Sequence, residues 1–312
     1  MSRPIELSDD LSGLMEGIPD MEVELYREAI TRPLPECARV NTLKMQEAEV
    51  VQMLEERGWT LRPVPWARYG YFIDSTEGVG SSVYHMAGLI YIQGPLSMLP
   101  AESLDVRPGD RVLDLCAAPG SKSTQMAQLM ENRGVLVCNE VSTKRIRPLI
   151  SNLQRFGVLN HLVTQVDGRR FSRFASHTFD RVLVDVPCSS LGIAAKDWSL
   201  VRTYSKTVSE RLSRLQLSLL ISAFDCLREG GLLVYSTCTV HPLENEWPVS
   251  NLLEERDSAE VLSLRPSVLK SRSPLEEWEG LTFRSEVKRC FKAYPYDNWA
   301  EGFFVALIRR GR

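Results

Sequence analysis

Short apolar strands alternate with helical segments through the middle of this chain, and this alternation constrains the fold more than any other feature of the sequence. Between residues 111 and 238 the apolar runs are VLDL, VLVCNE, LVTQVD, RVLVDVP and LLVYSTC. Helical spacing predicts helices at about residues 123–130, 144–155 and 210–227. Apolar strands that alternate with helices imply a parallel sheet covered on both faces. We therefore expect an α/β fold with a doubly wound, mostly parallel sheet.

The first 75 residues have a different pattern, which predicts a separate small module. After an acidic lead-in over residues 1–20, we expect a helix, a strand, a second helix and two short strands, with prolines between them. This order is typical of a small α+β domain. A chain of 312 residues is long enough for one large domain and one small domain. We expect the boundary near residue 75, with residues 76–312 forming the large domain.

A tight turn follows the strand expected at residues 111–115 and opens the next helix. Its sequence, CAAPGSK, contains small residues, a proline and a glycine, which leave the backbone amides at the start of the helix accessible to a ligand. The turn lacks the spaced glycines of a dinucleotide fingerprint and the Gly-Lys pair of a P-loop. We expect a small polar molecule here, although an ordinary strand-to-helix turn has the same local pattern.

Polar residues and cysteines gather where the expected strands end. In an open α/β sheet the ligand lies outside the carboxyl ends of the strands, where the strand order reverses. Glu140 follows the turn by about twenty residues, where an acid can accept hydrogen bonds from the ribose hydroxyls of a nucleoside, although a surface acid is the alternative. The strand-end residues are Asp114, Cys116, Glu140, Asp167, Asp185, Cys188, Thr237 and Cys238.

The seven cysteines show no metal-binding or redox spacing. No two of them form a CxxC pair and the four histidines are scattered, so we expect neither a metal site nor disulfides. A cysteine here is therefore either a nucleophile or a small buried residue. Cys188 and Cys238 end two strands that we expect to lie beside the strand at residues 111–115, which would bring both thiols to one crevice.

Two thiols and a carboxylate at one edge of a sheet suit addition to a pyrimidine ring. A thiolate that adds to carbon 6 makes carbon 5 nucleophilic enough to accept a methyl group. A carboxylate can hydrogen-bond the amino group and the protonated nitrogen 3 of a cytosine, which stabilises the charge of the adduct. Asp185, three residues before Cys188, is placed for this role.

The charge of the chain is slightly acidic but uneven. The formal net charge is -3 and the pI is about 5.9, which argues against a wholly basic nucleic-acid-binding protein. Residues 169–214 carry nine basic residues against four acids, a surplus that would suit a phosphate backbone. With no apolar run long enough for a membrane span and no apolar signal region, we expect a cytoplasmic protein.

Several separated motifs resemble those of the Nol/Nop/Sun group of RNA cytosine-5 methyltransferases. LDLCAAPGSK resembles the S-adenosylmethionine (SAM) loop of that family, DVPCSS its proline-cysteine motif, and YSTCTVHPLENE its threonine-cysteine motif. RVNTLK, YIQGPLSMLP and EGFFVALIRR are similar to further landmarks, so the resemblance spans roughly residues 35–310. Two positions depart from the family pattern, because Ser190 stands where glycine is usual and Tyr296 where histidine is common.

The resemblance implies a Rossmann-like SAM methyltransferase that modifies carbon 5 of a cytosine in tRNA or rRNA. It implies that Cys238 is the nucleophile, that Cys188 helps to release the methylated product, and that Asp185 acts beside them. The implied cofactor-binding residues are Cys116, Ala117, Ala118, Pro119, Gly120, Ser121, Lys122, Glu140, Arg145, Asp167 and Asp185. We expect RNA as the partner, no metal, and a monomer.

Two other readings of the same motifs stay open on the sequence. In a DNA cytosine-5 methyltransferase the thiol of the proline-cysteine motif, here Cys188, would attack the base. The ENE that follows Cys238 and the RNA-family landmarks speak against this reading. An RNA-binding assembly factor that has lost turnover would keep the fold, but both cysteines and all the proposed pocket acids are present.

Overall fold

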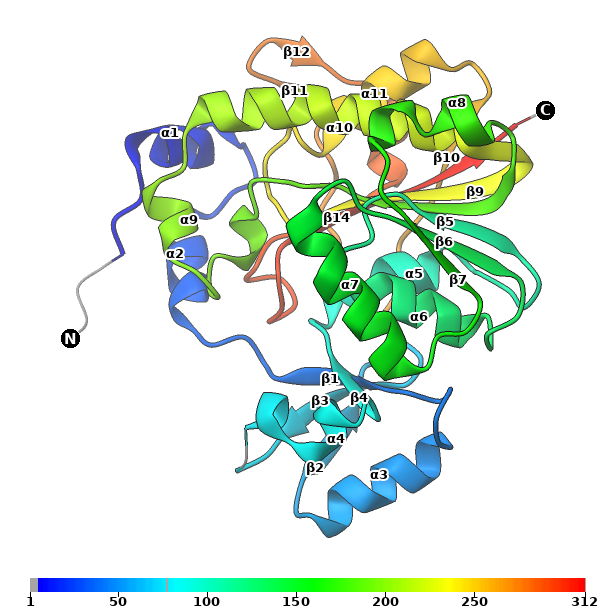
Figure 1. Ribbon diagram of the computed structural model, residues 1–312. Helices are drawn as coiled ribbons and strands as arrows, with labels where there is room; N and C mark the ends of the chain where they lie inside the picture. Colours follow the sequence, from blue (N-terminus) through cyan, green and yellow to red (C-terminus); the bar gives the residue numbers. More distant parts are fainter. Residues whose placement is uncertain (1–4, 77, 312) are drawn as a thin grey trace.

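The large domain is built on one mixed sheet in the computed structural model, which describes residues 5–76 and 78–311 (Figure 1). The strands of this sheet are β5 (Arg111–Asp114), β6 (Val135–Asn139), β7 (His161–Thr164), β8 (Phe179–Asp185), β9 (Leu227–Thr237), β10 (Ala259–Leu262), β13 (Phe291–Ala293) and β14 (Phe303–Arg310). Their order is β10-β14-β9-β8-β5-β6-β7, with β13 paired to β14. Strands β5 to β9 pair in parallel, whereas the pairs made by β14 are antiparallel. The expected mostly parallel α/β sheet is confirmed.

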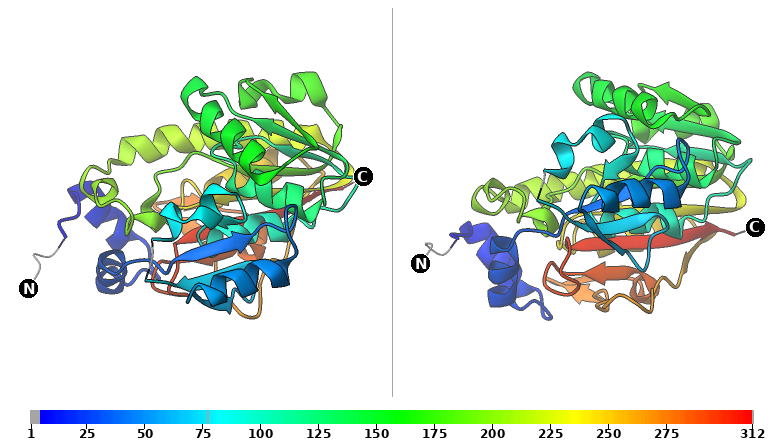
Figure 2. Two further views of the ribbon diagram at one scale, coloured as in Figure 1. Left: turned by 60° about the horizontal axis from the view of Figure 1, so that its bottom comes forward. Right: turned by 90° about the horizontal axis from the view of Figure 1, so that it is seen from below.

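Helices cover both faces of this sheet (Figure 2). One face carries α5 (Leu99–Ser103), α6 (Ser121–Leu129) and α7 (Thr143–Phe156), and the other carries α8 (Ser172–Ala175), α10 (Lys206–Cys226) and α11 (Glu246–Glu255). Side chains alternate between the faces of a strand, so Val112 lies in the core under α6 and α7 while Leu113 lies in the core under α10. A short helix α9 (Ser199–Arg202) and the hairpin β11 (Glu277–Trp278) and β12 (Leu281–Thr282) complete the domain.

A second, small sheet has the strand order β2-β3-β1-β4. Its elements are β1 (Cys37–Val40), α3 (Glu47–Glu56), β2 (Thr60–Pro63), β3 (Gly70–Asp74), α4 (Val83–Met86) and β4 (Ile90–Ile92). Val50 and Leu54 of α3 pack on this sheet. Strand β4 pairs with β1, and Ile92 lies opposite Ala38 in this pair. The boundary expected at residue 75 therefore falls inside the small domain, since β4 comes after it.

The N-terminal segment belongs to the large domain and not to the small one. Helices α1 (Asp9–Gly17) and α2 (Val23–Thr31) lie beside α9 (Figure 1). Leu11 and Tyr26 are buried in the same core as Val201. The Tyr26 hydroxyl donates to the Leu191 carbonyl at 2.8 Å, and the Ser8 amide donates to the Val201 carbonyl at 3.0 Å. The acidic lead-in thus contains a helix whose apolar face is part of the large core.

The small domain is attached to α6 by buried polar side chains. Arg39 of β1 is buried and donates to the Thr124 hydroxyl at 2.8 Å and to the Gln128 side chain. Gln128 in turn donates to the Val40 carbonyl at 2.9 Å. Helix α6 therefore forms part of both the sheet covering of the large domain and the contact with the small domain.

Candidate active site

The turn between β5 and α6 is held by its neighbours. Gly120, just before α6, has φ +107°, a left-handed conformation that glycine adopts without steric cost. The Ala117 amide donates to the Asn139 carbonyl at 2.8 Å. Arg145 of α7 donates to the Ala118 carbonyl at 2.6 Å. Strand β6 and helix α7 therefore hold the turn in place. The side chains of the turn itself are small and leave its backbone accessible.

A pocket beside this turn, which we call the acidic pocket, lies at the ends of β5 and β6. Its lining residues are Leu115, Cys116, Asn139, Glu140, Val141, Arg145, Asp167, Gly168, Arg169, Pro187, Leu215 and Leu219. The buried Glu140 carboxylate accepts from the Ser142 amide at 2.8 Å. Hydrogen bonds from the Arg169 guanidinium hold the pKa of the Asp167 carboxyl below its usual value. The pocket thus presents two carboxylates beside apolar side chains.

Two other predicted residues, Arg145 and Cys116, also line the acidic pocket. Arg145 places its guanidinium 3.4 Å from the Glu140 carboxylate. Cys116 is a strand-end thiol, and burial raises its pKa. Because a thiol with a raised pKa stays protonated, Cys116 is suited to line a pocket and not to attack a substrate.

A second pocket, which we call the thiol pocket, lies on the other side of the turn. Its lining residues are Tyr91, Ile92, Gln93, Gly94, Ser97, Pro119, Ser121, Lys122, Asp185, Ile193, Lys196, Cys238, Glu301 and Phe303. The Lys122 ammonium lies 2.7 Å from one Asp185 oxygen, and the Ser236 hydroxyl donates to the other at 2.6 Å. Burial alone would lower the pKa of Lys122, but Asp185 outweighs it and raises that pKa. The loop residue Lys122 and the strand-end residue Asp185 therefore form one ion pair, in which the lysine is buried and the carboxylate is partly exposed.

The two strand-end thiols meet, although the strands lie differently from the expectation. Strand β8 borders β5, but β9 lies beyond β8, so the expectation that both strands border β5 is wrong for β9. Because β8 and β9 are neighbours, the sulfurs of Cys188 and Cys238 are 3.2 Å apart. Only the Cys238 thiol lines the thiol pocket.

The pKa values of the two thiols are shifted in opposite directions. A hydrogen bond with Cys188 lowers the pKa of Cys238 despite its burial, and the Ser190 hydroxyl and the Lys122 ammonium act in the same direction. The same hydrogen bond, together with burial, raises the pKa of Cys188. Cys238 is therefore the more easily ionised thiol of the pair, and Cys188 is placed to donate a hydrogen bond to it.

A buried glutamate, Glu244, holds the loop after β8 by a hydrogen bond from the backbone of that loop. Glu244 accepts from the Ser189 amide at 2.9 Å, from the Ser209 hydroxyl at 2.7 Å and from the Gln216 amide at 2.9 Å. Ser190, the position where the related family has glycine, has φ +59° and places its hydroxyl 3.6 Å from the Cys238 sulfur. The left-handed backbone explains why glycine suits this position, and the hydroxyl adds a contact that glycine would lack.

Several residues of the thiol pocket were not among the predicted site residues. Ser97 contacts Lys122 at 3.2 Å, and Glu301 lies 3.4 Å from Lys196. Seven lining residues lie in segments noted only as family landmarks, YIQGPLSMLP and EGFFVALIRR, and that resemblance was the available signal. Among residues 5–76 and 78–311 there is no group of three or more His, Cys, Asp or Glu side chains placed to hold a metal ion.

The basic surplus of residues 169–214 is only partly gathered in space. Arg169, Arg211 and Arg214 line one groove, which shares Arg169 and Leu215 with the acidic pocket. Arg181 instead donates to the Asp105 carbonyl at the opposite end of the sheet. The groove that could bind a phosphate backbone therefore contains fewer basic residues than the count along the sequence indicates.

Comparison with known proteins places this architecture in a family. Residues 101–309 match the family of the 16S rRNA methyltransferases RsmB/F, and residues 7–95 match the N-terminal domain of 16S rRNA methyltransferase RsmF. The chain belongs to the RsmB/F methyltransferase family. The expected Nol/Nop/Sun membership, RNA methyltransferase activity and use of SAM are thereby confirmed.

Individual relatives of this family are similar over most of the chain. A tRNA (cytosine(49)-C(5))-methyltransferase of Pyrococcus abyssi is 44% identical, over 90% of each chain. The ribosomal RNA small subunit methyltransferase F of Vibrio parahaemolyticus is 40% identical over 93% of this chain, which spans only 60% of that relative. The crystal structure of a methyltransferase homologue from Pyrococcus horikoshii superposes with a TM-score of 0.84 at 32% identity, covering 96% and 94% of the two chains.

In the described part of this chain, no helix has the length and apolar character needed to span a membrane.

Proposed function

We propose that this chain transfers a methyl group from SAM to carbon 5 of a cytosine in tRNA, through a covalent adduct on Cys238. The observation that carries the proposal is the thiol pair, in which the pocket-lining Cys238 has the lowered pKa and its neighbour the raised one. tRNA is the first candidate substrate because a tRNA enzyme is 44% identical over 90% of both chains. rRNA is the second candidate, because both family descriptions name 16S rRNA enzymes.

The acidic pocket supports a site for SAM. Glu140 and Asp167 provide acceptors for ribose hydroxyls and for an adenine amino group, and the apolar side chains of Leu115 and Leu219 suit the adenine ring. The remaining cofactor-binding residues that we propose are the turn from Cys116 to Lys122, Arg145 and Asp185. When bound there, SAM supplies an electrophilic methyl group next to the thiol pocket.

The thiol pocket supports the addition step. The Cys238 thiolate would form a bond to carbon 6, and the electron pair of the 5,6 double bond would then form the bond from carbon 5 to the methyl group, while the bond from that methyl group to the SAM sulfur breaks and leaves its electron pair on the sulfur. Asp185, which is ion-paired with Lys122, would accept hydrogen bonds from the cytosine amino group and protonated nitrogen 3. These contacts stabilise the charge that the addition would otherwise leave on the ring.

Release of the product needs a proton to leave carbon 5 and the bond from sulfur to carbon 6 to break. Loss of the proton restores the double bond and expels Cys238 as a thiolate. Cys188 lies 3.2 Å from that sulfur and carries a hydrogen-bond donor for it. We assign Cys188 to this release step, in which it stabilises the departing thiolate.

The test is methylation of defined RNAs by the purified chain. Labelled SAM is incubated with tRNA, with 16S rRNA and with duplex DNA, and bisulfite sequencing locates the modified cytosine. The proposal requires 5-methylcytosine in tRNA that depends on Cys238. Methylation of rRNA alone would favour the second candidate, and methylation of DNA would refute RNA as the substrate.

Two properties of the whole protein are part of the same proposal. Both thiols and all the pocket acids come from one chain, so we propose that a monomer is sufficient for activity. Sedimentation at assay concentrations measures this directly. We also propose a cytoplasmic location, where a tRNA substrate would be met, and cell fractionation tests it.

A further inference from the structure

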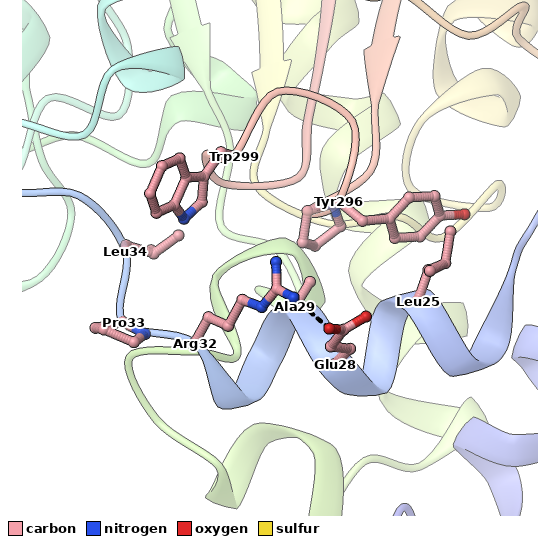
Figure 3. Close-up of a pocket in the computed structure, with 9 residues that line it drawn as sticks. Leu25, Glu28, Ala29, Arg32, Pro33, Leu34, Tyr296 and Trp299 are labelled. Carbon is pink, nitrogen blue, oxygen red and sulfur yellow. Dashed lines mark hydrogen bonds and ion pairs between the residues drawn. The ribbon is translucent and has the colours of Figure 1, made fainter.

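Trp299 presents its indole on the surface of the loop between β13 and β14. Its side chain is 69% exposed, compared with 42% for Trp198, the other exposed tryptophan in the described residues. The ring forms one wall of a groove that Leu34 and Arg32 face from the segment after α2 (Figure 3). Pro33, Pro295 and Tyr296 also line this groove. An indole left in solvent beside further apolar side chains is typical of a binding surface.

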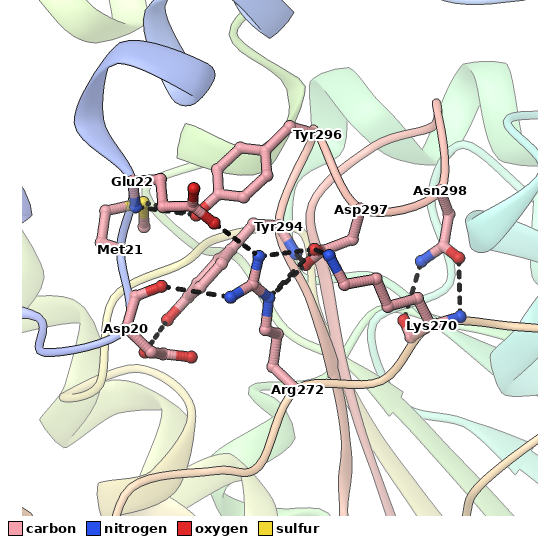
Figure 4. Close-up of polar contacts among 9 residues, drawn as sticks. All are labelled: Asp20, Met21, Glu22, Lys270, Arg272, Tyr294, Tyr296, Asp297 and Asn298. Carbon is pink, nitrogen blue, oxygen red and sulfur yellow. Dashed lines mark hydrogen bonds and ion pairs between the residues drawn. The ribbon is translucent and has the colours of Figure 1, made fainter.

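The loop that carries this indole is held by charged and aromatic side chains. The Asp297 carboxylate accepts from Arg272 at 2.8 Å and lies 2.9 Å from the Lys270 ammonium (Figure 4). The Arg272 guanidinium packs against the neighbouring rings of Tyr294 and Tyr296, 5.4 and 5.3 Å from their centroids. The loop is therefore braced by charges and rings on the residues that precede Trp299.

The backbone of Trp299 is itself unusual. Its φ is +47°, in the left-handed region that bulky residues rarely adopt. Such a conformation persists only where the surroundings enforce it, and it is common at binding sites. The fold thus keeps a strained backbone at the residue that presents an apolar ring to solvent.

The groove and the thiol pocket are lined by nearby residues of one chain segment, although they share no lining residue. Glu301, two residues after Trp299, lines the thiol pocket together with Phe303 and Cys238. Two residues span at most about 7 Å of backbone, so the segment that carries Trp299 leads directly into the wall of the thiol pocket. Lys196, which approaches Glu301 at 3.4 Å and is half-exposed, adds a positive charge at this wall.

We propose that Trp299 forms a stacking subsite for an unpaired base that flanks the target cytosine in the RNA. Every base has a π-face that stacks on an aromatic ring, and RNA recognition commonly uses such stacking on unpaired nucleotides. The Arg32 guanidinium across the groove, which is ion-paired with the lining residue Glu28, provides a second planar partner. Because stacking does not read the edge of a base, the subsite accepts any base identity and holds the register of the strand.

The inference rests on the proposed function, and its test uses RNA oligonucleotides with single abasic positions. Wild-type chain and Trp299→Ala are assayed with the normal substrate and with substrates lacking one base on either side of the cytosine. In the wild type, one abasic position raises the KM for RNA by about fivefold or more. In Trp299→Ala the normal substrate shows the same rise, and removing that base has no further effect. Trp299→Phe restores most of the affinity.

Controls separate this subsite from folding and from other partners. The SAM affinity and Tm of Trp299→Ala stay at wild-type values, and Leu159→Ala, an exposed apolar residue at the amino end of β7, leaves the KM for RNA unchanged. An unchanged KM in Trp299→Ala, or an equal abasic penalty in both proteins, would overturn the subsite. A change of oligomeric state in Trp299→Ala would also overturn it, in favour of contact between copies of the chain. If the wild-type chain failed to methylate any RNA, the proposed function would be refuted independently of Trp299.

Discussion

The acidic pocket and the thiol pocket share one turn but are held together differently. The basic partners of the acidic pocket face solvent, since the side chains of Arg145 and Arg169 are 52% and 53% exposed. In the thiol pocket the exposure is reversed, because the Lys122 side chain is 8% exposed and its partner Asp185 is 31% exposed, whereas Glu140 beside Arg145 is 3% exposed. Removal of the acid therefore leaves an exposed arginine in the acidic pocket but a buried lysine in the thiol pocket. An exposed ion pair contributes little, whereas a buried charge that loses its partner is costly. The acidic pocket should therefore tolerate substitutions in graded steps, and the thiol pocket should not.

The largest expected effect is that of Cys238→Ala, which removes the thiolate of the thiol pocket. Removing a catalytic nucleophile lowers the rate by about 10⁴-fold or more, while the binding of SAM and RNA should persist. The measurements are single-turnover methylation and binding of both ligands. Cys226→Ala, in which a buried cysteine outside both pockets is changed, serves as the control and should remain active. Turnover by Cys238→Ala would show that the attacking group is elsewhere.

Cys188→Ala should fail at a later step than Cys238→Ala. The variant still attacks and methylates, but it accumulates a covalent RNA complex that survives a denaturing gel, because release is impaired. Loss of the Cys188 hydrogen bond also raises the pKa of Cys238, so the single-turnover rate should need a higher pH than in the wild type. Ser190→Ala should move the profile in the same direction. A covalent complex with Cys238→Ala and none with Cys188→Ala would reverse the two assignments.

Glu140→Ala tests the graded behaviour of the acidic pocket. Losing one hydrogen bond to a buried ligand costs about 1 to 3 kcal/mol, which corresponds to roughly a 5-fold to 150-fold weaker SAM affinity. Calorimetry without RNA measures this, with the exposed Glu131→Ala as a matched control. We expect the rate at saturating SAM to stay near that of the wild type. Unchanged SAM affinity would remove Glu140 from the pocket.

The smallest effect is expected at the rim of the acidic pocket, in the basic groove. Replacing Arg211 and Arg214 by alanine removes two charges that face the groove. RNA binding should then depend less steeply on salt, and the logarithmic slope should fall by about 0.7 for each phosphate that is no longer neutralised. Arg107→Ala with Arg133→Ala removes two exposed charges at the amino ends of the strands and should leave the slope unchanged. Equal slopes for both pairs would mean that the RNA follows another face.

The regular part of this fold could be predicted from local patterns. Strand and helix periods predicted β5, α6, β6, α7 and α10 because each buries one face on its neighbours. The position of β9 beyond β8 could not be predicted, since strand order depends on crossovers and not on local residues. The burial of Leu11 and Tyr26 in the large core was also missed, because their partners lie far away along the chain.

The site shows the same division between local and distant signals. Cys188 and Cys238 were found because each follows an apolar strand, whereas the assembly that sets their acidities uses Ser190, Lys122 and Glu244 from separate segments. Tyr296 had no explanation on the sequence alone. Its hydroxyl accepts from the Glu22 amide at 2.9 Å and its ring lies against Arg272, so the residue joins α2 to the loop that carries Trp299.

Lys122 connects the turn beside the acidic pocket to the thiol pocket. It is the second residue of α6, directly after the turn, and its ammonium contacts Asp185 in the thiol pocket. The same helix is bonded to the small domain through Thr124 and Gln128. We expect ligand binding in one pocket to alter binding in the other through this helix, and any such linkage is reciprocal. We expect the exchange of SAM for its demethylated product to change the affinity for RNA, which would give the catalytic cycle a preferred order of binding and release.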